Sequence, residues 1–188
     1  AARHSPHLEI FNEKGIEVLL MYDRIDEWLM SHLNEYEKKK FQSVAIGSIE
    51  ELDFAKSAED KTSPSKLEQE KDDFKETIEK VKASLKDKVQ DVRLTLRLTS
   101  SPSCVVANEG EMTNQMQRLM RSAGQMINTK PILELNPHHL LVLRLKEEKD
   151  EKSFNDLSQV LFDQAILAEG GQLDDPATFV RKFNELLV

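Results

Sequence analysis

The apolar residues between positions 154 and 168 constrain the fold of this chain more than any other feature. They are Phe154, Leu157, Val160, Leu161, Phe162, Ala165, Ile166, Leu167 and Ala168. On a helix they occupy more than half of the circumference, whereas a helix with one face on a core needs an apolar stripe about 100° wide. We predict that Ser153 begins this helix, that Gly170 and Gly171 end it, and that Asp175 with Pro176 begins a second one. The extra apolar surface of this helical hairpin must be covered.

Two arrangements would cover that surface. A second copy of the hairpin, related by a two-fold axis, would make an intermolecular four-helix bundle, and two-fold dimers are the commonest oligomers. The alternative is a central helix buried within one chain. We favour the dimer, with an interface made of Phe154, Leu157, Leu161, Phe162, Ala165, Ile166, Phe179, Phe183, Leu186 and Leu187.

Upstream of the hairpin, the apolar pattern changes from helical to strand spacing. A long helix is predicted from Lys66, with apolar residues at Leu67, Phe74, Ile78, Val81, Leu85 and Val89. A strand with one buried face follows, in which Val92, Leu94, Leu96 and Leu98 alternate with Arg93, Thr95 and Arg97. Residues 103–107 and 131–135 predict two more strands, and Asn136 with Pro137 begins a helix through Lys146. Residues 66–188 therefore predict an α+β domain with a small three-stranded sheet.

The first 57 residues have a different organisation. Residues 16–21 are a mostly apolar run of strand length, and residues 41–44 are expected to form another short strand. Between them, Asp23 begins a helix whose apolar spacing continues to Tyr36. The α/β pattern itself covers roughly the first 45 residues, which are too few to close a core alone, because stable domains rarely fall below about 50 residues. We predict that it is the C-terminal end of a larger domain, joined through a connector at 58–65 to the domain at 66–188.

Composition excludes several classes of function. The 188 residues carry a net charge of −8, and no dense basic cluster stands out beyond Lys38, Lys39 and Lys40, so nucleic acid is not an expected partner. No apolar run reaches membrane-spanning length. The glycines form no phosphate-binding loop, and the single cysteine, Cys104, lacks partners for a metal site and is expected to be a small apolar residue on a strand. We therefore predict no catalytic residue, no metal and no cofactor in this chain.

Four of the six methionines fall close together, at Met112, Met116, Met120 and Met126. With Leu119, Ala123 and Ile127 they share one arc of a helix about a third of a turn wide. Methionine is flexible and polarisable, so it packs against irregular partners and recurs on promiscuous binding surfaces. This stripe is either buried core or an exposed binding face.

Several motifs, taken in order, carry a resemblance to a known family. They are RHSPHLE at 3–9, GIEVLL at 15–20, DRIDEW at 23–28, FQSV at 41–44, DVRLT at 91–95, RLT at 97–99, ELNP at 134–137, DQA at 163–165 and NELL at 184–187. The chain resembles the C-terminal part of the heat-shock protein 90 chaperones, most closely their bacterial branch. The resemblance covers nearly the whole chain.

The resemblance implies a homodimeric, ATP-driven chaperone of the bacterial cytoplasm, of which this chain is a fragment without the ATP- and magnesium-binding domain. It implies dimerisation through the last two helices and binding of non-native client proteins. The implied client contacts are Glu27, Trp28, Met112, Met116, Leu119 and Met120. The alternative is a purely structural dimerisation domain with the methionine helix buried as core.

Overall fold

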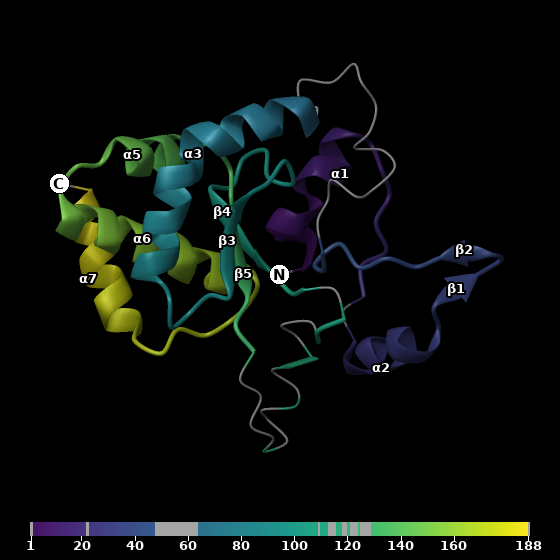
Figure 1. The fold of residues 1–188 in the computed structure, drawn as a ribbon. Helices are drawn as coiled ribbons and strands as arrows, with labels where there is room; N and C mark the ends of the chain where they lie inside the picture. Colours follow the sequence, from purple (N-terminus) through teal and green to yellow (C-terminus); the bar gives the residue numbers. More distant parts are fainter. Residues whose placement is uncertain are drawn as a thin grey trace.

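The computed structural model describes residues 2–21, 23–47, 64–108, 110–112, 116–117, 120, 124 and 129–187. The elements, in chain order, are η1 (Ala2–His4), η2 (Pro6–Leu8), α1 (Glu9–Glu13), α2 (Arg24–His32), β1 (Glu35–Tyr36), β2 (Lys39–Lys40), α3 (Pro64–Ser84), β3 (Asp91–Leu94), β4 (Ser103–Val106), β5 (Ile132–Leu135), α5 (Leu140–Glu147), α6 (Glu151–Ala168) and α7 (Pro176–Leu186) (Figure 1). This mixture of helices and small sheets agrees with the predicted α+β class. The predicted boundary at 58–65 falls largely outside the described residues, although its last two residues already belong to α3.

The three strands predicted in the C-terminal region form one sheet. Their order is β3-β5-β4, with β3 parallel and β4 antiparallel to the central strand β5. The first strand is shorter than predicted and ends at Leu94. The last ladder bond runs from Thr95 N to Leu135 O, and the Thr95 hydroxyl then accepts from Arg97 N at 3.1 Å. This local side-chain bond replaces the next ladder bond and turns the chain.

One face of the sheet carries the main core. Figure 1 shows α3, α5, α6 and α7 on this side of the sheet and α1 on the other. The buried cluster comprises Phe74, Val81, Leu85, Val89, Val92, Leu94, Leu96, Val105, Leu133, Leu135, Val142, Leu145, Phe154, Leu157, Leu161, Phe162 and Ala165. Helix α6 therefore lies inside the single chain, between β4, α3 and α7. A second copy is not needed to cover most of α6, so the covering argument for a dimer is wrong for this helix.

The second face of the sheet is also buried, which the alternating pattern did not predict. It carries Cys104, Val106, Ile132 and Glu134, all less than a tenth exposed. Cys104 is a buried residue on β4, as expected. Arg97, predicted on a solvent-facing side, is 1% exposed. The N-terminal region, residues 2–47, covers this face through η2 and the segment around Val44.

The N-terminal region departs most from the prediction. Residues 16–21 and 41–44 are not strands, and the ladder found within residues 2–21 and 23–47 is the short hairpin β1-β2. Glu37 and Lys38 turn this hairpin with φ of 49° and 65°. Helix α2 begins at Asp23 as predicted, with a capping box, but it ends at His32. An apolar run forms a strand only where a neighbouring strand accepts its hydrogen bonds.

Helix boundaries in the C-terminal region follow capping chemistry. Helix α6 is capped by Asp150, which accepts from Ser153 N at 2.8 Å, so Ser153 is not the cap. His139 rather than Asn136 caps α5, through a bond from Leu141 N to His139 Nδ1 of 3.1 Å. Asp175 caps α7 as predicted. In each case an acceptor side chain satisfies an otherwise unpaired N–H group of the first turn.

Candidate functional site

Helix α2 presents an apolar surface to solvent. Trp28 is 59% exposed, and Ile25 and Leu29 on the same helix are also exposed. The Trp28 ring lies 4.6 Å from the His32 ring, centroid to centroid, with the two ring planes tilted by 39°. The Glu27 side chain falls outside what the structure describes. Of the two predicted contacts on α2, Trp28 is therefore available to a partner.

The methionine segment is described at a few positions. Met112 is 44% exposed, whereas Met116 and Met120 are half-buried. Gln117 is buried, and its Nε2 donates to Met112 O at 2.9 Å, which fixes the backbone beside Met112. Leu119 and the remaining members of the stripe lie outside the described residues, so a continuous amphipathic helix stays a prediction.

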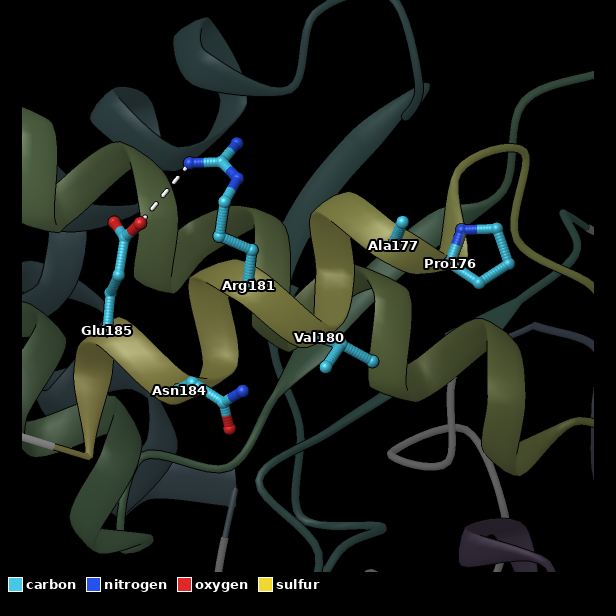
Figure 2. A pocket seen from close by; sticks show the side chains of 6 residues that line it. All are labelled: Pro176, Ala177, Val180, Arg181, Asn184 and Glu185. Atoms are coloured by element: carbon cyan, nitrogen blue, oxygen red, sulfur yellow. Dashed lines mark hydrogen bonds and ion pairs between the residues drawn. The ribbon is translucent and has the colours of Figure 1, made fainter.

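Helix α7 offers a second apolar surface, on the side away from α6. The structure describes every residue of this helix, and none of them is buried. A shallow depression on this side is lined by Pro176, Ala177, Val180, Arg181, Asn184 and Glu185 (Figure 2). Val180, Phe183 and Leu187 are exposed on and just after this helix. On the inner side, Lys182 Nζ meets Asp156 Oδ1 of α6 at 2.9 Å.

The predicted dimer interface divides into three groups. Phe154, Leu157, Leu161, Phe162 and Ala165 are buried in the core of the single chain. Ile166, Phe179 and Leu186 are half-buried between α6 and α7 or at their ends. Phe183 and Leu187 are exposed. The surface that a second copy could contact therefore lies on α7 rather than along α6.

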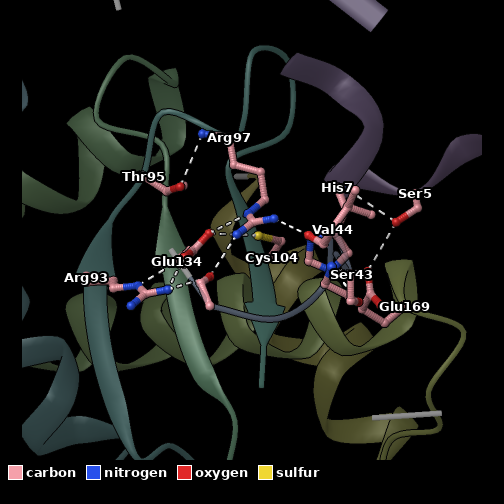
Figure 3. Close-up of polar contacts among 12 residues, drawn as sticks. Ser5, His7, Ser43, Val44, Arg93, Thr95, Arg97, Cys104, Glu134 and Glu169 are labelled. Atoms are coloured by element: carbon pink, nitrogen blue, oxygen red, sulfur yellow. Dashed lines mark hydrogen bonds and ion pairs between the residues drawn. The ribbon is translucent and has the colours of Figure 1, made fainter. Parts of the chain in front are cut away.

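A buried charge cluster lies on the second face of the sheet (Figure 3). Glu134, on the central strand, is 1% exposed and accepts from both Arg93 and Arg97. Arg93 Nη2 lies 2.7 Å from Glu134 Oε1, and Arg97 Nε lies 2.9 Å from Glu134 Oε2. Burial alone would raise the pKa of Glu134, but the two guanidiniums outweigh burial and hold this pKa below its usual value. The carboxylate is therefore charged in the folded protein.

The sequence did not single out this cluster. The sequence feature that could have revealed it is a lone acidic residue, Glu134, within an otherwise apolar strand. Arg93 and Arg97, which alternate with apolar residues, are its possible partners. The Cys104 thiol lies 3.7 Å from the Glu134 carboxylate. Burial raises the pKa of Cys104 well above its usual range, and the nearby carboxylate raises it further. Because the thiolate is the reactive form, this cysteine is an unreactive core residue.

Two further polar contacts join the N-terminal region to the C-terminal region. The Glu9 carboxylate accepts from the backbone N–H groups of Thr99, Ser100 and Ser101 at 2.7 to 3.1 Å. His7, which is almost fully buried, places its Nε2 3.0 Å from a carboxylate oxygen of Glu169, just after α6. Both contacts are made by residues of the RHSPHLE motif at 3–9.

Neither a metal centre nor a membrane span emerges from the described residues. Within them, no group of three or more His, Cys, Asp or Glu side chains is arranged to hold a metal ion. Among the helices they form, none is both long enough and apolar enough to cross a membrane. The adjacent histidines have structural positions, since His138 is exposed and His139 caps α5.

Comparison with known proteins defines the class. The family model described as Hsp90 protein matches residues 1–188, and the chain belongs to this family. The chaperone protein HtpG of Dechloromonas aromatica is 56% identical over all of this chain, that of Methylococcus capsulatus 55%, and that of Nitrosomonas eutropha 54%. The predicted membership of the bacterial HtpG branch is confirmed. The chain spans 29% of the length of these relatives.

Proposed function

We propose that this chain is the dimerisation and client-binding part of an ATP-dependent chaperone of the bacterial cytoplasm. The observation that supports client binding is the exposure of two large apolar side chains, Trp28 on α2 and Met112 after β4. ATP and magnesium would bind in other parts of the longer protein, since the chain spans 29% of its relatives. This chain by itself would not be an enzyme.

The proposed client face comprises Glu27, Trp28, Met112, Met116, Leu119 and Met120. An exposed indole supplies a large, rigid apolar contact, and methionine supplies a contact that adapts to different partners. A non-native protein displays apolar side chains in no fixed arrangement. An adaptable, partly exposed face therefore suits such a partner better than a rigid pocket does.

Aggregation of reduced insulin, followed by light scattering, tests this proposal. The double substitution Trp28→Ser with Met112→Ser should weaken suppression of aggregation by roughly thirtyfold, because it removes two apolar contacts of about 1 kcal/mol each. Leu140→Ser removes a still more exposed apolar side chain on α5 and should leave suppression unchanged. Equal losses in both variants would contradict a localised client face.

The structural alternative predicts a different outcome. If the methionines are core, Met112→Ser with Met116→Ser should lower the free energy of unfolding by about 2–5 kcal/mol, as truncation of buried large residues does. A contact face instead predicts a small change in stability, with the loss confined to the aggregation assay. Urea unfolding followed by circular dichroism separates the two.

The proposed homodimer forms through the outer side of α7. Helix α7 has eleven residues, and none of them is buried. Val180, Phe183 and Leu187 are therefore exposed apolar side chains that a second copy could cover. A two-fold axis near the depression of Figure 2 would bring this side of α7 against its own copy. The Arg181 and Glu185 side chains at the rim, 3.3 Å apart, could exchange partners across the axis.

Sedimentation equilibrium tests the dimer. Phe183→Asp and Val180→Asp should each shift the chain from dimer to monomer at micromolar concentration, because a charge would be buried in an apolar contact. Leu161→Asp is unsuitable, because Leu161 is fully buried in the chain's own core. Leu140→Asp on α5 is the matched control and should remain dimeric. A monomeric wild-type chain would refute this interface.

A further inference from the structure

The Arg93–Glu134–Arg97 cluster reaches beyond its own charges to a segment far away in sequence. Arg97 donates from Nη1 to Val44 O and from Nη2 to Gly47 O, the latter at 2.9 Å. Arg93 Nη2 donates to the same Gly47 carbonyl at 3.0 Å. Figure 3 shows the Arg97 guanidinium between Glu134 and the Val44 segment. Arg97 therefore binds the carboxylate through Nε and backbone carbonyls through its terminal nitrogens, whereas Arg93 Nη2 donates to the carboxylate and to the Gly47 carbonyl together.

The contacted segment, residues 44–47, continues the sheet at its edge. Ile46 makes a parallel bridge with Ala107, just after β4. Gly47 N donates to Ala107 O at 3.1 Å, and Ala107 N donates to Ala45 O at 3.3 Å. Gly47 has a φ of 71°, a conformation that favours glycine, and the segment turns there. The segment is the end of the N-terminal region that carries Trp28.

Neutralising Glu134 does not require these contacts. The Nε atoms of both arginines already face the carboxylate, while the terminal nitrogens of Arg97 face the segment. We infer that the cluster is a clamp, in which two guanidiniums held by Glu134 fix segment 44–47 on the sheet and so orient the region that carries Trp28. The clamp does not depend on client binding, and Trp28 serves below as a reporter only.

Lysine substitutions separate the clamp from the charge. A lysine at position 97 or 93 keeps a positive charge beside Glu134 but lacks the planar fork that bonds the carboxylate and a carbonyl together. In Arg97→Lys and Arg93→Lys, amide hydrogen exchange at Gly47 and Ala107 should accelerate about tenfold or more, as expected for loss of charge-assisted hydrogen bonds. Exchange at Val105 and Leu133, inside the sheet, should change less than about twofold.

A second readout reports the orientation of the N-terminal region. Trp28 is the single tryptophan of the chain, so its fluorescence anisotropy decay follows α2 alone. The decay should be faster in both lysine variants than in the wild type. Lys82→Met is the matched control, because it removes a cation that contacts β3 through Asp91 at 2.7 Å without contacting segment 44–47. It should leave both readouts unchanged.

Two outcomes would overturn the clamp. One is unchanged exchange at Gly47 and Ala107, or unchanged Trp28 anisotropy, in folded lysine variants. The other is an equal acceleration at Gly47 and inside the sheet, which would show a general loss of stability. Should Arg97→Lys fail to fold, Arg93→Lys decides, because the Arg93 side chain is 31% exposed and tolerates change better.

Discussion

The two regions of this molecule differ in how much apolar surface each one buries in its own interior. The C-terminal region, residues 64–108 and 129–187, is built on one continuous apolar cluster that joins the sheet to α3, α5 and α6. In the N-terminal region, residues 2–47, the buried cluster is small, with Ile10 and Phe11 buried and Val44 packed against them. Its other large apolar side chains, Trp28 among them, are mostly exposed.

Several contacts between the regions are polar, beside the apolar second face of the sheet that the N-terminal region covers. Glu9 binds backbone N–H groups of residues 99–101, His7 meets Glu169, and two arginines hold the segment around Val44. Interfaces between parts of a chain are usually more polar than a core and allow relative motion. Apolar burial therefore determines the fold of the C-terminal region, whereas directional polar contacts, together with the apolar sheet face beneath it, determine where the N-terminal region lies.

The largest effect expected from this comparison is in the shared core of the C-terminal region. Leu161→Ala removes a fully buried side chain and should lower the free energy of unfolding by about 2–5 kcal/mol. Urea unfolding followed by far-ultraviolet circular dichroism measures the change. Leu140→Ala, at an exposed position of α5, should change stability by about 0.5 kcal/mol or less. Similar losses at both positions would refute the single-core description.

A second prediction concerns the order of unfolding. Because the N-terminal region buries little apolar surface, its opening should require less free energy than global unfolding. Trp28 fluorescence should therefore change at a lower urea concentration than the helical signal, which comes mostly from the C-terminal region. Coincident transitions would indicate one cooperative unit. Phe11→Ala should widen the separation, and Leu161→Ala should narrow it.

Much of the C-terminal region could be predicted from the sequence. Helices α3, α6 and α7 follow from apolar spacing, and Asp175 with Pro176 marks the start of α7. Strands β4 and β5 follow from short apolar runs. These signals are local, because a helix or strand that packs on one core repeats its apolar residues at the period of its own backbone.

What could not be predicted depends on contacts between distant residues. Because Arg97 alternates with leucines, the pattern predicted that its side chain faces solvent. It is instead buried, where it donates to the Glu134 carboxylate and to the Val44 carbonyl. Residues 16–21 have strand composition without a strand partner in the described structure. For the candidate site, Trp28 was found through the family resemblance, since spacing alone describes any packed helix. The apolar surface of α6 is covered by its own sheet, which no local pattern reveals.

Acid should weaken the contact between the regions at Glu9. Burial alone would raise the pKa of Glu9, but the Ser101 hydroxyl and the N–H groups of residues 99–101 outweigh it and lower this pKa below 4.5. The contribution of this contact is therefore complete above about pH 4.5, the unfolded value, and is lost as pH falls through the lower folded pKa. Amide exchange or chemical shifts of Ser100 and Ser101, titrated from pH 6 to pH 3, follow the loss.

Two variants test the assignment of this acid effect. Glu9→Gln should abolish the pH dependence at Ser100 and Ser101, because the glutamine side chain stays neutral throughout. Glu13→Gln, on the same helix α1, should retain it. A pH dependence that persists in Glu9→Gln would assign the effect to another group.

The smallest effect is expected at the junction of α6 and α7, where an ion pair accompanies half-buried apolar side chains such as Ile166 and Leu186. Lys182 and Asp156 form an ion pair with side chains 20% and 16% exposed. Lys182→Met should cost about 1 kcal/mol or less and should raise amide exchange in α7 alone, since α7 buries none of its residues. Lys152→Met, whose 3.6 Å pair with Glu185 is largely exposed, should have no measurable effect. If Lys182→Met instead destabilised β5, α7 would belong to the same cooperative unit as the sheet.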